Sequence, residues 1–389
     1  MAEQDAVKPE LDFSLVRDDP LYRLQRRLKL IPAGGLGTVR RSVFFALLTW
    51  LPLAAWALLS GILFPGENRM TFLQQYGLHV RCLLSIPLLI LGEAPLERGV
   101  RTVLTEFRRR DILCEADLPR WAEILASTTY QHCNRLSWAG LAALLLVFTV
   151  SGGLAREVGW LVSSAELGTD FGSLWFLYVV RPVSIGLLLV WLWRLLLTGL
   201  FWRISHLDLQ LAPSHPDRFG GLGMLELLPW CLIPFALAVS GALSGRIAAE
   251  MVGLGTSLSS YALMVAVFVA IMVLLLLAPQ MAYAPVLLRT RIHGLLEYGE
   301  LLSRHGRLVR QRWILGWQIT EDPLLDAPEL GPSVDVNSLY QAVAAINPLA
   351  VGLRSLLAAV FATLLPLLPL VLLQFPLTEV LLRLAGALF

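Results

Sequence analysis

The chain has 389 residues, of which 56% are hydrophobic and 15% are charged, and its mean hydropathy is +0.67. Soluble globular proteins carry about 25% charged residues, so this composition excludes a soluble globular protein and predicts an all-α, polytopic membrane protein. The formal net charge of +2 gives no indication of a nucleic-acid partner. The cysteines have neither CxxC nor metal-ligand spacing, so they predict no metal site and no disulfide framework.

Residues 1–42 form a basic N-terminal segment with an amphipathic stretch at residues 21–32, LYRLQRRLKLIP. Cationic side chains can contact lipid phosphates while Leu and Ile enter the bilayer, so a membrane-surface helix is one interpretation. A solvated helix that packs on the rest of the protein is the other. The segment lacks a short apolar core followed by a small-residue cleavage site, so no cleavable signal peptide is expected.

Residues 43–374 form the predicted transmembrane domain, with about seven apolar stretches. Each is close to the roughly 20 residues that a helix needs to cross a hydrocarbon core about 30 Å thick. The predicted spans are residues 43–64, 75–95, 136–154, 174–201, 223–245, 259–287 and 349–374.

The distribution of positive charge predicts the orientation of these spans. Most of the 31 Lys and Arg residues lie in the N-terminal segment and in residues 96–135, 202–222 and 288–354. The connections on the opposite side contain only Arg69, Arg156, Arg246 and Arg383. Because positive charge accumulates in cytoplasmic loops, the N-terminus is predicted to be cytoplasmic and the C-terminus to lie outside.

Two cytoplasmic insertions, residues 96–135 and 288–346, are predicted to be helical. In the first, Asp117 is placed to N-cap the helix that leads into the third span. In the second, apolar residues recur at helical spacing over residues 286–313, so a helix continues from the sixth span. Residues 375–389 are predicted to form a short interfacial helix outside, and re-entry into the bilayer is the alternative.

A polar, glycine-rich segment between the fourth and fifth spans, Arg203–Glu226, is the first candidate site and is called the hinge below. It contains two His-x-Asp pairs followed by an arginine and clustered glycines, just before an apolar span. The candidate ligand- or ion-binding residues are His206, Asp208, His215, Asp217, Arg218, Gly220, Gly221, Gly223 and Glu226.

Three interpretations of the hinge remain open. Backbone amides at the start of the fifth span, its helix dipole and Arg218 would suit a phosphate or another anion. Imidazole and carboxylate groups could hold a divalent metal, but nothing in the spacing fixes a coordination geometry, so no metal is predicted. Alternatively, Asp217 or His215 caps the helix while Pro216 and the glycines shape a turn.

The hinge also carries a resemblance. Together with DPLYRLQRRL, GLLEYGELLSRH, LLDAPE and LRSLLAAVFATLLPLLPL, the segment LDLQLAPSHPDRFGGLGMLE resembles a widespread family of uncharacterised bacterial multi-spanning integral membrane proteins. Members of this family carry an HPDRxGGLG segment, and the similarity extends over nearly the full chain. The resemblance implies a bacterial inner-membrane protein, and it implies neither an activity nor a cofactor.

Charges within spans form the second candidate site. Arg81 lies in the second predicted span and Arg181 in the fourth. A charge in the bilayer costs about 2.5 to 3.5 kcal/mol on insertion scales and usually faces protein or water. One interpretation is an outer vestibule that favours anions, with Glu226 at the inner mouth. In the other, Arg81 extends to the outer interface.

The second interpretation gives Arg181 an acidic partner in the outer loop. The candidates for this partner are Glu157, Glu166 and Asp170.

The last span combines small residues with Pro366 and Pro369, which suits either a pore-lining helix with an apolar constriction or an ordinary packed helix. The buried arginines and the glycine-rich inner mouth favour a channel or transport protein for a small ion or solute over an enzyme. The alternative is a membrane-embedded enzyme or lipid-binding protein that acts at the inner leaflet through HPDRFGGLG. The expected partners are the lipid bilayer, anionic lipid headgroups and further copies of the chain.

Overall fold

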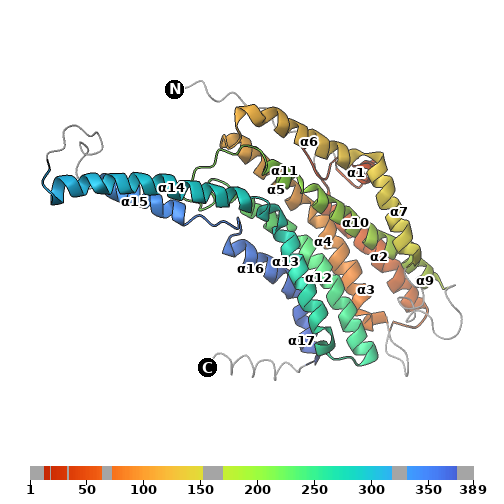
Figure 1. Ribbon diagram of the computed structural model, residues 1–389. Coiled ribbons are helices and arrows are strands. Elements are labelled where there is room, and N and C mark those ends of the chain that lie inside the picture. Colours follow the sequence, from red (N-terminus) through yellow and green to blue (C-terminus); the bar gives the residue numbers. More distant parts are fainter. Residues whose placement is uncertain are drawn as a thin grey trace.

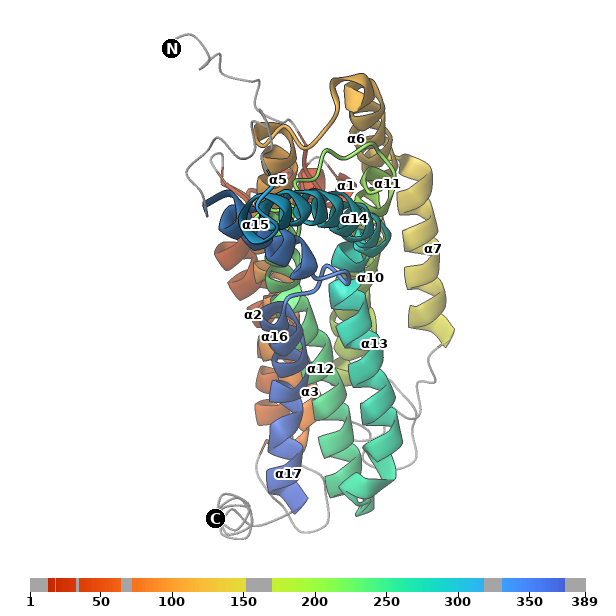
Figure 2. The same ribbon diagram turned by 60° about the vertical axis from the view of Figure 1, so that its left-hand side comes forward.

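The computed structural model describes residues 13–17, 19–32, 35–63, 72–151, 170–317 and 331–374. These residues form helices and loops, with one isolated β-bridge between Leu113 and Leu209, so the predicted all-α fold is confirmed. The helices build an elongated bundle from which one long helix projects sideways (Figures 1 and 2).

Six helical stretches are long and apolar enough to cross a membrane: Thr38–Leu59, Tyr76–Arg109, Phe171–Ile204, Gly223–Gly253, Leu258–Met281 and Leu353–Leu373. Each of them overlaps a predicted span. The remaining prediction, residues 136–154, coincides with α7 (Arg135–Ser151), whose apolar part is shorter than the other six. The protein is therefore a membrane protein with six span-length helices in its described part, close to the expected seven.

The helix α12 (Leu227–Leu254) forms the centre of the bundle. It packs against α3 (Tyr76–Val80), α5 (Glu93–Arg109), α13 (Ala262–Met281) and α16 (Leu353–Leu364). Its approach to α3 depends on two glycines, because a Cβ atom added to Gly245 would lie 2.9 Å from the Cα atom of Gly77. Small residues at such crossings let helix backbones pack closely within a membrane.

Two spans contain a π-helical turn. Arg81–Ser85 joins α3 to α4 (Ile86–Leu91), and Phe176–Val180 joins α9 (Phe171–Trp175) to α10 (Arg181–Leu197). A proline follows each turn, Pro87 in the first case and Pro182 in the second. A proline lacks an N–H group and clashes with the carbonyl four residues earlier, which explains why each helix widens there. Single π-turns within α-helices are frequent at functional sites.

The two ends of the bundle differ. The α14 end carries α1 (Pro20–Arg27), α6 (Leu118–Cys133) and α14 (Ala284–Val309), whereas the α17 end carries α17 (Leu368–Gln374) (Figures 1 and 2). The helix α14 starts after a break at residues 282–283 and runs across the direction of the spans (Figure 2).

The two predicted helical insertions lie at the α14 end. The first contains most of α5 and all of α6, and the second contains most of α14 and all of α15 (Gly331–Ala344). The helix α15 packs along α14. Residues 375–389, the predicted interfacial helix, lie outside the described residues.

The described part of the N-terminal segment packs into the α14 end of the bundle. Phe13, Leu15 and Val16 are buried. The carboxylate of Asp19 accepts a hydrogen bond from the backbone N–H of Tyr22 and so caps α1. The described residues of this segment therefore follow the packed interpretation, although Leu24 stays exposed on α1.

Asp117 takes the predicted N-cap position of α6, but its side chain makes no capping hydrogen bond. Its Oδ2 atom instead accepts from the backbone N–H of Asp208 at 2.7 Å. The adjacent hinge residue Gln210 donates its N–H to the carbonyl of Ile112 at 2.8 Å. The predicted capping role of Asp117 is therefore wrong. Its carboxylate binds the backbone of the hinge instead of the first turn of α6.

Candidate functional site

The second half of the hinge folds around the carboxylate of Asp217. Backbone N–H groups of Phe219, Gly221 and Gly223 donate to it at 2.8, 3.1 and 2.9 Å. The Nδ1 atom of His215 lies 2.9 Å from its Oδ1 atom. Burial raises the pKa of Asp217, but the three amides and His215 outweigh burial, so the pKa lies below its usual value.

Positive φ angles create this ring of amides. Arg218 has a φ of 62°, Gly220 of 63° and Gly221 of 100°. Successive residues that include left-handed conformations turn their N–H groups toward one point, which forms an anion-binding concavity. In the described structure the anion in this concavity is the protein's own Asp217, so the arrangement follows the capping and turn interpretation of the hinge.

The hinge is also joined to the start of the last span. The carbonyl of the exposed Arg218 accepts a hydrogen bond from the N–H of Asn347 at 3.0 Å. The carboxylate of Glu226 rests against Gly352, where an added Cβ atom would lie 1.7 Å from Oε1. Glu226 therefore contacts the backbone just before α16, and a side chain at position 352 would require the Glu226 carboxylate to move.

The first His-x-Asp pair belongs to a different place. His206 Nδ1 lies 2.7 Å from the carbonyl of Trp202, and the backbone of Asp208 bonds to Asp117. Both residues line a cavity shared with α14, and neither His215 nor Asp217 is among its lining residues. The structure thus pairs His215 with Asp217 and separates them from His206 and Asp208. Within the described ranges, no group of three or more His, Cys, Asp or Glu residues is placed to hold a metal ion.

The two intramembrane arginines do come together. They line a cavity of about 520 Å³ within the bundle, to which Arg246 of α12 adds a third guanidinium group. Arg81 comes from the first π-turn, and Arg181 directly follows the second. The hydroxyl-bearing residues Ser85 and Ser184 also line the cavity, and none of its described lining residues is acidic.

Each arginine has contacts that hold it at the cavity. The guanidinium of Arg81 lies 5.7 Å from the ring centroid of Phe176, within reach of a cation–π interaction. Arg181 is buried and donates through Nη2 to the carbonyl of Phe148 at 3.0 Å. Arg246 is largely exposed and pairs with Glu250 at 3.1 Å.

Of the acidic partners expected for Arg181, Asp170 directly precedes α9. The other two, Glu157 and Glu166, lie outside the described residues.

A tightly packed aromatic pair lies about one helical turn beyond this cavity, toward the α14 end. The ring of Trp191 stacks on Phe235 with a centroid distance of 5.3 Å. Its indole N–H donates to the carbonyl of Leu89 at 2.7 Å. A Cβ atom added to Gly92 would lie 2.9 Å from Trp191. Trp191 is fully buried.

A buried cluster of charges lies beyond Trp191. Arg194 Nη1 contacts Glu93 Oε1 at 2.9 Å, and Arg194 Nη2 contacts Asp19 Oδ2 at 3.4 Å. Arg41 forms a hydrogen-bonded ion pair with the same Glu93. His132 Nε2 lies 4.0 Å from Asp19 Oδ2. All five side chains are at most 2% exposed, so the two arginines and two carboxylates neutralise each other in place of water.

The N-terminal segment covers this cluster. The backbone N–H of Leu15 donates to Glu97 Oε2 at 3.1 Å. Burial raises the pKa of Asp19, although Arg194 opposes the shift. Burial, and then the positive charge of Arg194, lower the pKa of His132 to about 4. His132 is therefore neutral near pH 7, and the charge balance of the cluster depends on Asp19.

The chain matches no protein-family model, no curated protein and no solved structure. Its function must therefore be argued from the geometry of its own residues.

The buried cluster is not among the sites predicted from the sequence. One part of the cluster could have been predicted. Glu93 and Arg194 lie at the ends of neighbouring spans, and opposite charges at one depth tend to pair. No local pattern connects them with Asp19 or His132.

Proposed function

We propose that this protein is a membrane transport protein that admits a small anion into the cavity at Arg81 and Arg181. The observation that carries the proposal is the grouping of these two residues with Arg246 around one cavity of about 520 Å³ without an acidic lining residue in the described part. Guanidinium groups bind carboxylate and phosphate oxygens in a bidentate manner, and a charge held within a bilayer is usually functional.

The packed pair Trp191 and Phe235 supports a gated transporter over an open channel. Trp191, which stacks on Phe235, lies about one helical turn beyond Leu188, a lining residue of the cavity, and so separates the cavity from Arg194 on the same helix. At 1.5 Å per residue, Glu93 lies about 18 Å beyond Arg81 on one span, and Arg194 lies about 20 Å beyond Arg181 on the other. A conformational change would have to separate the aromatic pair before an anion could pass.

The N-terminal segment would form the second closure. Leu15 and Asp19 contact the buried cluster, so an anion that reached Arg41 and Arg194 would compete with Asp19 for the same guanidinium groups. An anion also compensates the positive charge that displacement of Asp19 would leave behind. In this proposal the α14 end is cytoplasmic, by the positive-inside rule, and the membrane is the bacterial inner membrane.

Anion flux in proteoliposomes tests the proposal. The purified full chain is reconstituted in liposomes loaded with an anion-sensitive dye, and the entry of chloride, nitrate and acetate is measured against the entry of potassium. We expect uptake of at least one of these anions without potassium flux. The Arg81→Gln and Arg181→Gln variants should each lose most of that uptake, because each removes one of the positive charges at the cavity.

The matched control is Arg109→Gln, which removes an exposed arginine at the α14 end. It should leave uptake unchanged. If no anion enters, if potassium enters equally well, or if all three variants reduce uptake by the same factor, the proposal fails.

A homo-oligomer also remains a proposal. The last span exposes Leu357, Phe361 and Leu368 along one side, and this apolar surface suits either lipid chains or another copy of the protein. The mass of the detergent-solubilised protein, determined by native mass spectrometry, distinguishes a monomer from an oligomer. This question is independent of the anion cavity, which one chain forms by itself.

A further inference from the structure

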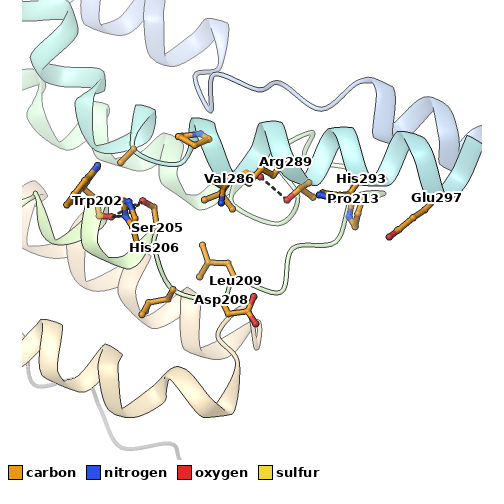
Figure 3. Close-up of a pocket in the computed structure, with 15 residues that line it drawn as sticks. Trp202, Ser205, His206, Asp208, Leu209, Pro213, Val286, Arg289, His293 and Glu297 are labelled. Carbon is orange, nitrogen blue, oxygen red and sulfur yellow. Dashed lines mark hydrogen bonds between the residues drawn. The ribbon is translucent and has the colours of Figure 1, made fainter.

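A second cavity, of about 490 Å³, lies at the α14 end between residues 202–213 and the first turns of α14 (Figure 3). It adjoins the points where two membrane spans end, at Ile204 and at Met281. The indole of Trp202 borders it and is 60% exposed. Tryptophan is enriched at the level of lipid headgroups, so this cavity lies at the depth of the headgroups.

Charged side chains of opposite sign line this cavity. Arg289, His293 and Glu297 are four residues apart on α14, and this spacing places them along one face of the helix. Asp208 lies across from them on the hinge (Figure 3). Among the described residues, the side chains of Arg289, Glu297 and Asp208 form no ion pair with one another or with other groups.

His206 also lines this cavity. Its Nδ1 atom lies 2.7 Å from the carbonyl oxygen of Trp202. A carbonyl oxygen can only accept a hydrogen bond, so Nδ1 must carry the proton. Among the charged side chains, the cavity offers the guanidinium of Arg289 as a donor and the carboxylates of Asp208 and Glu297 as acceptors.

This combination selects the chemical class of a ligand. Arg289 suits a phosphate group, whereas Asp208 and Glu297 suit a primary ammonium group. The remaining wall includes Ala282, Pro285 and Val286, next to the end of α13, and would contact apolar parts of a ligand. We propose that this cavity binds a phosphoethanolamine group, presented either as a phospholipid headgroup or as a soluble phosphodiester.

The same chemistry disfavours related groups. Two carboxylates against one guanidinium repel an anionic headgroup such as phosphatidylglycerol. A quaternary ammonium group has no N–H to donate and is usually bound by an aromatic cage, but among the described lining residues Trp202 is the sole Trp, Tyr or Phe. This inference is independent of the anion cavity, because the two cavities share no lining residue.

Competitive lipid binding tests the inference on the full chain in detergent micelles. Phosphatidylethanolamine, phosphatidylcholine and phosphatidylglycerol of the same acyl chains are added at equal concentration, and native mass spectrometry measures the bound fraction of each. We expect phosphatidylethanolamine to bind about tenfold more tightly than either of the others, which corresponds to about 1.4 kcal/mol. Glycerophosphoethanolamine, added as the soluble arm, shows whether the acyl chains are required: displacement of the lipid indicates recognition of the headgroup alone.

The variants Arg289→Gln, Asp208→Asn and Glu297→Gln each remove one charge from the cavity and should each weaken phosphatidylethanolamine binding about tenfold. Two exposed residues of the same helix that do not line the cavity provide matched controls, Arg304→Gln and Glu300→Gln. The inference is overturned if phosphatidylglycerol or phosphatidylcholine binds as tightly as phosphatidylethanolamine. It is equally overturned if the cavity variants bind like the controls.

Discussion

Arg194 and Glu93 form a buried ion pair with an Nη1–Oε1 distance of 2.9 Å, and their side chains are 2% and 1% exposed. They come from two different membrane spans and meet on the α14 side of Trp191. A buried charge is tolerated when it is paired and hydrogen-bonded, and Arg41 and Asp19 complete the pairing here. This cluster fixes the relative positions of the two spans and of the N-terminal segment.

Glu93→Gln should strongly destabilise the protein, because it leaves the guanidinium groups of Arg41 and Arg194 buried without their shared carboxylate. Breaking a buried ion pair by removing one partner costs about 3 to 5 kcal/mol. Thermal unfolding in detergent, monitored by size-exclusion chromatography, measures the change in stability. The control Glu106→Gln removes the partner of the more exposed residues Arg109 and Arg110 and should cost at most about 1 kcal/mol. Equal losses in both variants would contradict a special role of the buried pair.

The protein should lose stability as the pH falls from 6.5 toward 4, in part because of His132. Its pKa is lowered from 6.5 to about 4 in the folded state, so the unfolded chain binds this proton first within that window. Each unit of difference is worth about 1.4 kcal/mol. The raised pKa of Asp19 acts in the opposite direction, because its folded state holds a proton to higher pH.

His132→Gln isolates the contribution of the histidine. Its melting temperature, measured from pH 4 to 7, should change less with pH than that of the unmodified protein, since the titrating imidazole has gone while Asp19 remains. Parallel profiles for the two proteins would show that His132 does not cause the acid sensitivity.

Asp217→Ala should destabilise the hinge, because it leaves the N–H groups of Phe219, Gly221 and Gly223 without their acceptor. Unsatisfied buried donors cost about 1 to 3 kcal/mol. His215→Ala removes one partner of the carboxylate but leaves the amides satisfied, so its effect on stability should be smaller. Melting temperature and yield after purification measure both effects.

Variants at the same two positions distinguish a structural hinge from a ligand site. If the segment binds a ligand, Asp217→Asn and His215→Ala should abolish transport in proteoliposomes while insertion and folding stay intact. Loss of yield together with transport indicates the capping role instead. Arg218→Gly removes the candidate anion-binding guanidinium without backbone strain, since glycine adopts the φ of 62° at this position without a steric penalty, so loss of transport at normal yield in this variant would indicate a ligand site.

Gly245→Ala should separate α12 from α3. The added Cβ atom would lie 2.9 Å from the backbone of Gly77, which cannot move like a flexible side chain, and overpacking of this kind typically costs about 1 to 3 kcal/mol. Gly140→Ala on α7 is the matched control, because nothing lies within 4 Å of its added Cβ atom. It should be neutral or raise the melting temperature slightly, since alanine favours a helix over glycine. A larger loss in Gly140→Ala than in Gly245→Ala would refute the close crossing.

Parts of the candidate sites followed from the sequence. The pattern placed Arg81 and Arg181 within spans as possible lining of an anion cavity, and the structure brings both to one cavity. The sequence pattern also grouped His206 and Asp208 with His215 and Asp217, but the structure separates these pairs. The spacing of nine residues between the pairs could not reveal this, because Asp117 anchors the backbone of Asp208 and turns the loop toward α14.

For the cavity at α14, too, one part follows from the sequence and another depends on the tertiary structure. Arg289, His293 and Glu297 are regularly spaced in the sequence, so a helix predicts that they share a face. Their meeting with Asp208 depends on the break between α13 and α14, which directs α14 across the bundle (Figures 1 and 3).

The sequence by itself determined that this is an all-α membrane protein and where its spans lie, because a run of apolar residues long enough to cross a bilayer is a local property. Only the tertiary structure decided which charges meet. Asp19 and Arg194 are 175 positions apart, and they are in contact because each buried charge must find a partner when water is excluded. Such pairing depends on how the helices pack, and no local sequence pattern specifies it.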